Sequence, residues 1–298
     1  MTGVYLIKKS STFLDSVVTA ALLLFLGYIT YRLSVGLHYH WDWGVIPNYL
    51  LRWDEEKRRW VSNILLDGFF TTIRLSIWAI LFATMIGVVV GILRTRKRLL
   101  FRLIGRSYVE LIRNIPPLVL VFIFYFFISD QLMLLLGVDE FIRNQTGFTA
   151  SFLDFTVAPP ELFTSFISGV LTIALFQGAY IAEIVRAGIQ SIDNEQWEAS
   201  AALGLTWLQQ MRFIVLPQAT RRVLPPLTNE FINTIKYSSI VSIISIQELT
   251  FQGMQVMSST QRTNEVWLTI SLMYFLLCFA VSLIARRLEK TMAEETTR

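Results

Sequence analysis

A stripe of polar side chains runs along an otherwise apolar segment, residues 224–246, of this 298-residue chain. The stripe holds Asn229, Glu230, Asn233 and Lys236. At about 100° per residue of an α-helix, these side chains share one face about 120° wide. Polar groups are costly in an apolar medium, so this face is expected to line water or a partner protein. It suits a solute that carries both a carboxylate and an ammonium group, and the alternative is a structural ion pair of Lys236.

A second apolar segment, residues 162–189, carries polar residues of its own. Gln177 and Tyr180 lie near its middle, and Glu183 and Arg186 lie toward its end. The last two are at the i, i+3 spacing that allows an ion pair on a helix. Glu183 therefore fits a structural pair and a gating or coupling element equally well.

The composition indicates that membrane-spanning helices position these side chains. Hydrophobic residues make up 54% of the chain and charged residues only 16%, with a mean hydropathy of +0.53, whereas soluble domains have about 25% charged residues. A span needs about 20 apolar residues. Six segments reach this length: residues 13–35, 64–93, 116–136, 162–189, 224–246 and 266–285. The predicted fold is an all-α polytopic membrane protein with about six transmembrane helices.

The distribution of basic residues sets the expected orientation. Most of the 26 lysines and arginines fall on one side of the six predicted helices, including those of residues 94–113. Because basic residues concentrate in cytoplasmic loops, both termini are predicted to be cytoplasmic. The same pattern accounts for the net charge of +4 without nucleic acid as a partner. The external segment 37–63 carries four tryptophans, which fit either an interfacial belt or a binding surface.

Small residues recur at every fourth position along the helix predicted at 64–93. Ala83, Gly87 and Gly91 form a ridge that favours close helix packing, within the subunit or across a dimer. Thr72, nearer the outer end of the same helix, is a weaker candidate for contact with a substrate.

Motifs for enzyme chemistry are missing from the sequence. It contains no phosphate-binding G-x-x-x-x-G-K-[ST] loop, no H-E-x-x-H and no G-x-S-x-G. His38 and His40 lack a third ligand nearby, and Cys278 is the single cysteine. No metal site and no catalytic residue are therefore expected. The chain is expected to bind no cofactor and to take its energy from elsewhere.

The most informative segment is the cytoplasmic loop between the fourth and fifth predicted helices. Asp193 or Asn194 can cap a helix that ends at Gly204, and Thr206 can cap a second helix that ends near Pro217. The expected structure is a helical hairpin at the inner face of the membrane. Its small and apolar residues suit docking into a groove of another protein, and they also suit an amphipathic hairpin on the bilayer.

The spacing within this loop resembles the EAA motif of the membrane permease subunits of bacterial ATP-binding-cassette importers. The matching residues are Glu198, Ala199, Ser200, Gly204, Leu216 and Pro217, with Ser200 in place of the usual second alanine. Residues 113–125, 177–190 and 224–236 are similar to the polar amino acid branch of that family, the histidine, glutamine and arginine permeases. The resemblance covers residues 62–290. It departs at Tyr237, which with two serines replaces the Asp-Thr-Ser of many relatives.

The resemblance implies a type I importer permease core of five helices, preceded here by one extra N-terminal helix. Residues 1–61 would hold this helix and an external segment. Residues 62–290 would form the permease domain with a coupling hairpin at 191–222, and residues 291–298 would be a cytoplasmic tail. The implied location is the bacterial inner membrane.

The implied function is a permease subunit that forms the translocation pathway of an ATP-driven importer of polar amino acids by alternating access. Its partners would be an ATP-binding-cassette ATPase dimer that holds the ATP and docks at the EAA residues, a second permease subunit, homologous or identical, a periplasmic amino acid binding protein, and membrane lipid. If the fourth and fifth helices adjoin as in the family, the substrate pathway comprises Thr72, Gln177, Tyr180, Glu183, Asn229, Glu230, Asn233 and Lys236. The alternative is an ion-gradient-driven carrier or channel for small polar solutes. It favours paired carboxylates at mid-membrane or inverted repeats, which the sequence does not show.

Overall fold

The computed structural model describes residues 7–36 and 39–296, and the chain divides into two compact units between Asp42 and Trp43. The first unit contains helix α1 (Ile7–Gly36), whose Leu14–Arg32 stretch is long and apolar enough to cross a membrane. The side chains of this stretch are all exposed within the unit. The predicted N-terminal helix is confirmed, and His38 lies outside the described residues.

The second unit begins with a short helix followed by a two-stranded hairpin, neither of which the sequence analysis predicts. This region comprises the 3-10 turn η1 (Trp43–Val45), helix α2 (Ile46–Leu50), and the strands β1 (Leu51–Asp54) and β2 (Arg59–Ser62). The strands pair antiparallel, and the rings of Trp53 and Trp60 lie 5.6 Å apart across the hairpin. Asp54 Oδ1 accepts the backbone N–H groups of Glu56 and Lys57 at 3.0 Å, which closes the turn. Residues 43–61, grouped with the N-terminal helix in the predicted domains, thus lie in the second unit.

Helices α3 (Ile64–Arg94) and α9 (Phe163–Gln190) form the central pair of the second unit. Asn63 caps α3 through its side-chain oxygen, which accepts the Ile64 N–H at 2.9 Å. A Cβ atom at Gly87 or Gly91 would overlap the side chain of Ile181 or Val185 on α9. The small-residue ridge therefore serves close packing within the subunit.

Helix α4 (Leu99–Asn114) runs alongside this pair, and the sequence analysis, which places the basic residues of 94–113 on the cytoplasmic side, does not predict a helix there. It packs against α3 and α9, and Tyr108 Oη donates to the carbonyl oxygen of Leu175, near the middle of α9, at 2.5 Å. The buried face of α4 is small or apolar and comprises Gly105, Val109 and Ile112. An exposed face carries arginines. These charges lower the hydropathy of the segment, so a search for apolar length alone does not find α4.

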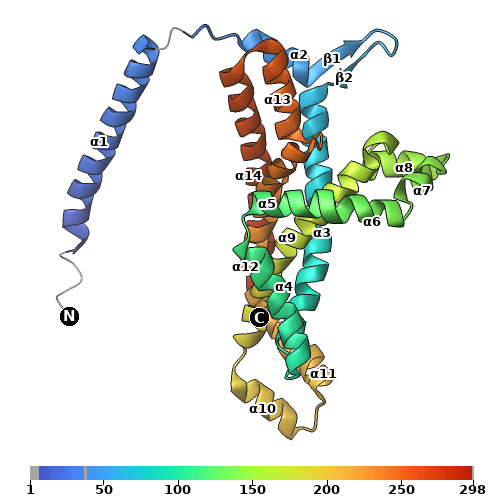
Figure 1. Cartoon of the computed structure of the whole chain (residues 1–298). Coiled ribbons are helices and arrows are strands. Elements are labelled where there is room, and N and C mark those ends of the chain that lie inside the picture. The colour runs from blue at the N-terminus through green and yellow to red at the C-terminus, as the bar shows by residue number, and fades with distance from the viewer. Residues whose placement is uncertain (1–6, 37–38, 297–298) are drawn as a thin grey trace. The chain divides into compact units, whose positions relative to one another are not determined.

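The following segment is broken into short pieces. It contains α5 (Pro117–Phe122), the π-helical stretch η2 (Ile123–Ser129), α6 (Asp130–Leu135), α7 (Val138–Arg143), α8 (Phe148–Thr156) and the 3-10 turn η3 (Pro160–Leu162). In Figure 1 the chain from α5 to α6 runs across α3 and α9, whereas α4 runs beside them. Arg74 of α3 donates to the Asp154 carbonyl oxygen at 2.9 Å, which ties α8 to the central pair.

The C-terminal part returns to the bundle through α12 (Leu216–Tyr237), the 3-10 stretch η5 (Ser238–Ile244), α13 (Leu249–Thr260) and α14 (Thr263–Thr296). Helix α12 packs on α9 and α14, and α13 packs on α3 and α14. Helix α14 extends through most of the predicted tail 291–298, whose last two residues lie outside the described part of the chain.

Five described segments are long and apolar enough to cross a membrane: Leu14–Arg32, Ile64–Arg94, Pro117–Leu135, Pro160–Gln190 and Thr263–Arg287. The predicted span at 224–246 is not among them. Its residues form the polar half of α12 and then η5, and α12 contains Pro225 and Pro226. It is nevertheless packed between α9 and α14, and the polar stripe is the reason for its lower hydropathy.

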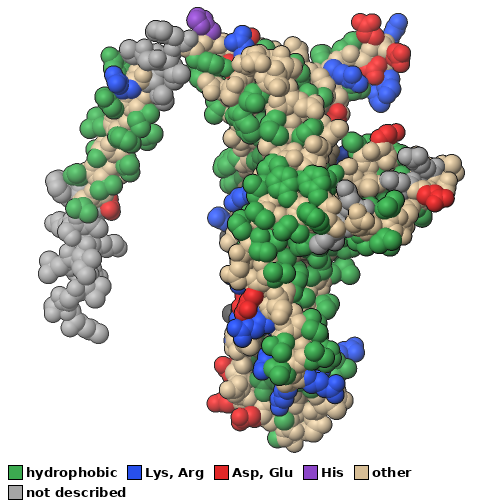
Figure 2. Space-filling model, viewed as in Figure 1, with side chains coloured by type: hydrophobic (Ala, Val, Ile, Leu, Met, Phe, Trp, Pro, Cys, Tyr) green, Lys and Arg blue, Asp and Glu red, His purple; other side chains and the backbone are tan. Residues whose placement is uncertain are grey.

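Charged side chains gather at the two ends of the second unit. Figure 2 shows them over the β1–β2 hairpin and around the α10–α11 region, with an apolar band between. Large apolar side chains of α14, such as Phe275 and Phe279, are more than half exposed. Such a surface suits lipid or a second membrane subunit.

Candidate functional site: a helical hairpin and a polar groove

The predicted hairpin is present as α10 (Asn194–Ala202), α11 (Trp207–Gln210) and the π-helical stretch η4 (Met211–Val215), which leads into α12. Gly204 joins the helices at a φ of +77°, the left-handed region that favours glycine. Thr206 and Gln209 form a capping box, in which the Thr206 N–H donates to Gln209 Oε1 at 2.8 Å. Asp193 occupies the N-cap position of α10 without a side-chain hydrogen bond to the helix.

The tip of this α10–α11 hairpin is a small-residue surface with apolar anchors. Ala199, Ala201 and Ala202 are exposed, and Leu203 is 79% and Leu208 66% exposed. Ser200 is instead buried, and its Oγ donates to the Trp197 carbonyl oxygen at 2.8 Å. The EAA position occupied by Ser200 thus faces the hairpin interior, whereas the alanine surface is open to a partner. Leu216 and Pro217 open α12 at the base of the hairpin.

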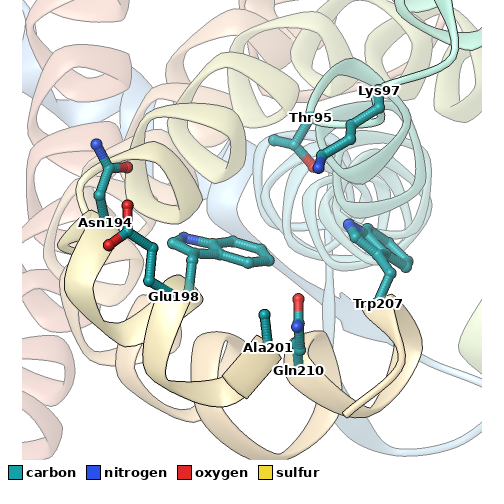
Figure 3. Close-up of a pocket in the computed structure, with 8 residues that line it drawn as sticks. Thr95, Lys97, Asn194, Glu198, Ala201, Trp207 and Gln210 are labelled. Atoms are coloured by element: carbon teal, nitrogen blue, oxygen red, sulfur yellow. The ribbon is translucent and has the colours of Figure 1, made fainter. Parts of the chain in front are cut away.

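A pocket of about 570 Å³ lies between the hairpin and the end of α3. Figure 3 shows its lining, which comprises Thr95, Lys97, Asn194, Trp197, Glu198, Ala201, Trp207 and Gln210. The Arg96 guanidinium lies 3.6 Å from the centre of the Trp207 ring, a cation–π contact that joins the segment directly after α3 to the hairpin. In the part of the chain that the structure describes, neither Lys97 nor Glu198 forms an ion pair.

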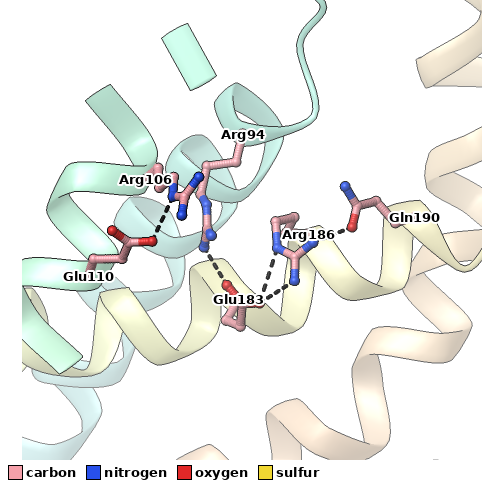
Figure 4. A network of polar contacts seen from close by, with 6 residues as sticks. All are labelled: Arg94, Arg106, Glu110, Glu183, Arg186 and Gln190. Carbon is pink, nitrogen blue, oxygen red and sulfur yellow. Dashed lines mark hydrogen bonds and ion pairs between the residues drawn. The ribbon is translucent and has the colours of Figure 1, made fainter. Parts of the chain in front are cut away.

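An ion network joins α3 to the end of α9 that leads into the hairpin (Figure 4). Glu183 pairs with Arg186, as its spacing predicts, and also with Arg94 at the end of α3. Arg186 also donates to Gln190, and Arg222 of α12 donates to the Ser191 carbonyl oxygen at the base of the hairpin. The ends of α3, α9 and α12 are thus fixed to one another. Arg94 is missed by the sequence analysis because no spacing along the chain relates it to Glu183.

The polar stripe of α12 divides between two environments. Gln177 Nε2 donates to Glu230 Oε2 at 3.2 Å and to Thr234 Oγ1 at 3.0 Å, so the fourth and fifth predicted helices adjoin. Asn233 lies beside the same carboxylate, at 3.5 Å. The buried Oε1 of Gln177 has no hydrogen-bond partner among the described residues.

Tyr180 continues this polar surface on α9. The Arg113 guanidinium of α4 lies 5.3 Å from the Tyr180 ring centre, and the ring of Phe176 is 5.1 Å from those of Tyr180 and Tyr237. Sequence reasoning places Arg113 on the cytoplasmic side and omits it from the site. Its position follows from the course of α4 through the bundle, which hydropathy does not reveal.

Lys236 and Asn229 face the other side of α12, where they line an open groove of about 720 Å³ between α12 and α14. Its other polar lining residues are Ser239, Thr250, Ser271, Tyr274, Cys278 and Ser282, and Trp267 contributes an aromatic wall. Lys236 is exposed and, within the described ranges, forms no ion pair. We refer to this feature as the α12–α14 groove.

Thr72 lies away from this groove surface. Its side chain is fully buried, its Oγ1 donates to Glu248 Oε2 at 3.3 Å, and it accepts the Leu249 N–H at 3.1 Å. Both hydrogen bonds engage the Thr72 hydroxyl inside the protein, so Thr72 can affect a substrate only indirectly, through Glu248 and Leu249.

The family of inner membrane components of binding-protein-dependent transport systems matches residues 83–294, and this chain belongs to that family. It is therefore a membrane permease component of a type I ATP-binding-cassette importer, with an extra N-terminal helix before the family core.

Individual relatives narrow the comparison. The chain is 33% identical over 228 residues to the probable glutamine ABC transporter permease protein GlnM of Bacillus subtilis (strain 168), covering 76% of this chain and 93% of that protein. It is 31% identical to the glutamate/aspartate import permease protein GltJ of Escherichia coli (strain K12), covering 84% and 94%. A solved amino acid ABC transporter with histidines is similar at a TM-score of 0.63 and 28% identity, over 85% of this chain and 100% of that chain. The inward-facing methionine transporter MetNI, at a TM-score of 0.57 and 19% identity over 76% and 95%, shares the fold.

Proposed function

We propose that this permease subunit forms the translocation pathway for polar amino acids in an ATP-driven importer. The observation that carries the proposal is the physical connection between the α10–α11 hairpin and the helices α9 and α12, which bear the polar residues. The hairpin is joined to them by a buried apolar cluster that includes Ile189, Met211 and Val215, with Trp197 and Trp207 packed against it. The names of the relatives, which concern glutamine, glutamate and aspartate, support the substrate class.

Energy would enter through the exposed alanine surface of the hairpin. Separate ATP-binding-cassette subunits would dock as a dimer at Glu198, Ala199 and Gly204, with Leu216 and Pro217 at the hairpin base, and the buried Ser200 would support this surface from inside the hairpin. The ATP is held by those subunits, and this chain binds no cofactor. Closure of the ATPase dimer would move the hairpin, α9 and α12 as one body, because these elements are joined by buried packing.

Substrate would pass between this chain and a second permease subunit, homologous or identical, after delivery by a periplasmic binding protein. Lys236 supplies a fixed cation for the substrate carboxylate, and Asn229 supplies an amide beside it in the α12–α14 groove. Gln177, Tyr180, Glu230 and Asn233 form the polar surface on the other side of α12. Glu183 belongs to the coupling connection rather than to the substrate surface. Both termini are cytoplasmic in this arrangement, and the protein resides in the bacterial inner membrane.

Reconstitution tests the proposal directly. The chain is purified with candidate ATPase, second permease and binding-protein subunits, inserted into proteoliposomes, and given radiolabelled polar amino acids. Uptake is expected only with ATP on the ATPase side and with binding protein present. Uptake driven by an ion gradient in the absence of the ATPase would overturn the proposal.

A further inference from the structure

A polar cluster outside the predicted site joins the α12–α14 groove to the protein interior. Glu248 is fully buried at the N-cap of α13, whereas Tyr274 and Thr250 line the groove. Tyr274 Oη donates to Glu248 Oε2 at 2.6 Å, and the Phe251 N–H donates to Glu248 Oε1 at 2.9 Å. Thr72 Oγ1 donates to Glu248 as well. The carboxyl group therefore accepts hydrogen bonds from three elements of the bundle, α3, α13 and α14.

These hydrogen bonds fix the polarity of the groove wall. A phenol hydroxyl has one hydrogen, and Tyr274 uses it in the hydrogen bond that it donates to Glu248. The 3.1 Å contact between Thr250 Oγ1 and Tyr274 Oη must then use the proton of Thr250. Both hydroxyl groups thus direct their hydrogens into the protein, and only oxygen lone pairs remain for the groove. At this pair of hydroxyl groups the groove wall offers only acceptors, which favours a cationic donor over a carboxylate.

Lys236 provides the complementary group in the same groove. It lines the groove together with Tyr274 and Thr250. The groove therefore presents both a cation and hydroxyl oxygens that can accept hydrogen bonds. An amino acid backbone carries one group for each, a carboxylate for Lys236 and an ammonium group for the two hydroxyl oxygens.

We propose that Tyr274 and Thr250 form the subsite for the α-ammonium group of the transported amino acid, and that Glu248 is a positioning residue that orients both hydroxyl groups. The proposal rests on the proposed function and deepens it, since it assigns the carboxylate of the substrate to Lys236 and its ammonium group to the hydroxyl groups of α13 and α14. Thr72, which also bonds Glu248, acts one step further from the substrate.

The test is equilibrium binding to the complete importer in nanodiscs, without binding protein. The probes are radiolabelled polar amino acids, and the competitor is the des-amino carboxylic acid of the amino acid that binds best. Glu248→Gln places an amide donor against Tyr274, so the phenol proton turns toward the groove. Affinity for the amino acid is expected to fall about tenfold or more, while affinity for the des-amino acid stays unchanged. Tyr274→Phe and Thr250→Val are expected to act in the same direction.

Tyr49→Phe is the matched control. The Tyr49 hydroxyl lies 3.5 Å from Ser259 on the same α13, but Tyr49 does not line the groove, so both affinities should stay at wild-type values. Equal loss of affinity for both ligands, or a lower Tm with unchanged discrimination, would show a purely structural role and overturn the inference. If Glu248→Gln does not fold, the proposal is tested by the affinities of Tyr274→Phe and Thr250→Val alone. Wild-type protein that binds none of the amino acids would count against the proposed function itself.

Discussion

Lys236 is the residue whose surroundings bear most directly on transport. Its ammonium group lies in the α12–α14 groove, and in the described part of the chain no carboxylate neutralises it. Glu230, on the same helix, instead accepts the amide of Gln177 on α9. A lone cation among membrane helices is costly unless water or a ligand solvates it. The charge is therefore available to a substrate.

Substitution of Lys236 by Met should reduce ATP-dependent uptake about tenfold or more, because the groove loses its cation. ATPase stimulation by the loaded binding protein should survive at least partly, since the hairpin is untouched. Uptake kinetics and melting curves are measured on Lys236→Met, Glu230→Gln and the double variant, with Lys57→Met on the exposed β-hairpin as control. A structural ion pair predicts a lower Tm for Lys236→Met and partial rescue in the double variant. Normal uptake by a stable Lys236→Met protein would remove Lys236 from the site.

A comparison of Glu183 with Glu110 tests how much the ion network stabilises the fold. Glu183→Gln removes a carboxylate charge and leaves the two partly buried guanidinium groups of Arg94 and Arg186 with a weaker acceptor. We expect the apparent Tm to fall by about 5 °C, equivalent to about 2 kcal/mol. Glu110→Gln breaks only the exposed pair with Arg106, which Figure 4 shows beside the network, and should change the Tm by less than about 2 °C. Equal shifts in the two variants would mean that the network contributes no more than a surface pair.

At the scale of elements, the α10–α11 hairpin is the feature that the sequence predicts best. Its signals are local: a cap position at Asp193, a left-handed glycine at Gly204 and a capping box that begins at Thr206. Helix α4 is the opposite case. Its arginines lower the hydropathy of the segment, so the search for apolar segments does not identify this helix, which packs within the bundle. The β1–β2 hairpin is missed for a related reason, since four-residue strands are too short for a periodic pattern.

Contacts between elements distant in the sequence account for the rest of what the sequence does not predict. Arg94 with Glu183, Arg113 with Tyr180, and Glu248 with Tyr274 each join different helices. A single sequence contains no periodicity that relates such pairs. The adjacency of Gln177 and Glu230 is expected only through the family resemblance, and the structure places the two in contact.

The geometry of the hairpin turn gives a prediction at this scale. A Cβ atom at Gly204 would meet nothing within 4 Å, so the only penalty of Gly204→Val is the positive φ. A β-branched residue at this φ is strained, and the turn that presents the alanine surface should distort. Uptake should fall at least about tenfold with normal amounts of protein in the membrane, and co-purification of the ATPase should weaken. Gly137→Val is the control, because Gly137 also has a positive φ, +61°, and open space around it, but lies at the start of α7. Equal effects of both substitutions would argue against a special role of the hairpin.

At the scale of the whole molecule, the family core and the N-terminal unit are separable. The matched region begins at residue 83, whereas α1 ends at Gly36 in a unit with its own contacts. The core also contains the excess of basic residues on one side of the predicted helices. Since that excess orients a membrane protein, the core should adopt its orientation without α1.

The topology of the chain is decided by whether the segment from α12 to η5 crosses the membrane. Five described segments are apolar enough to span the membrane. Helix α12 is less apolar, and it can be a sixth span because its polar side chains face α9 and the groove. With six crossings, reporter fusions after residues 48, 100, 150, 205, 255 and 298 should read outside, inside, outside, inside, outside, inside. If the segment instead lay at one surface, the fusions after 255 and 298 would exchange their readings, and an external C-terminus would contradict the arrangement. A variant that lacks residues 1–42 provides the internal control: the five fusions from 100 onward should keep their readings, because the basic residues near α3, α4 and the hairpin remain.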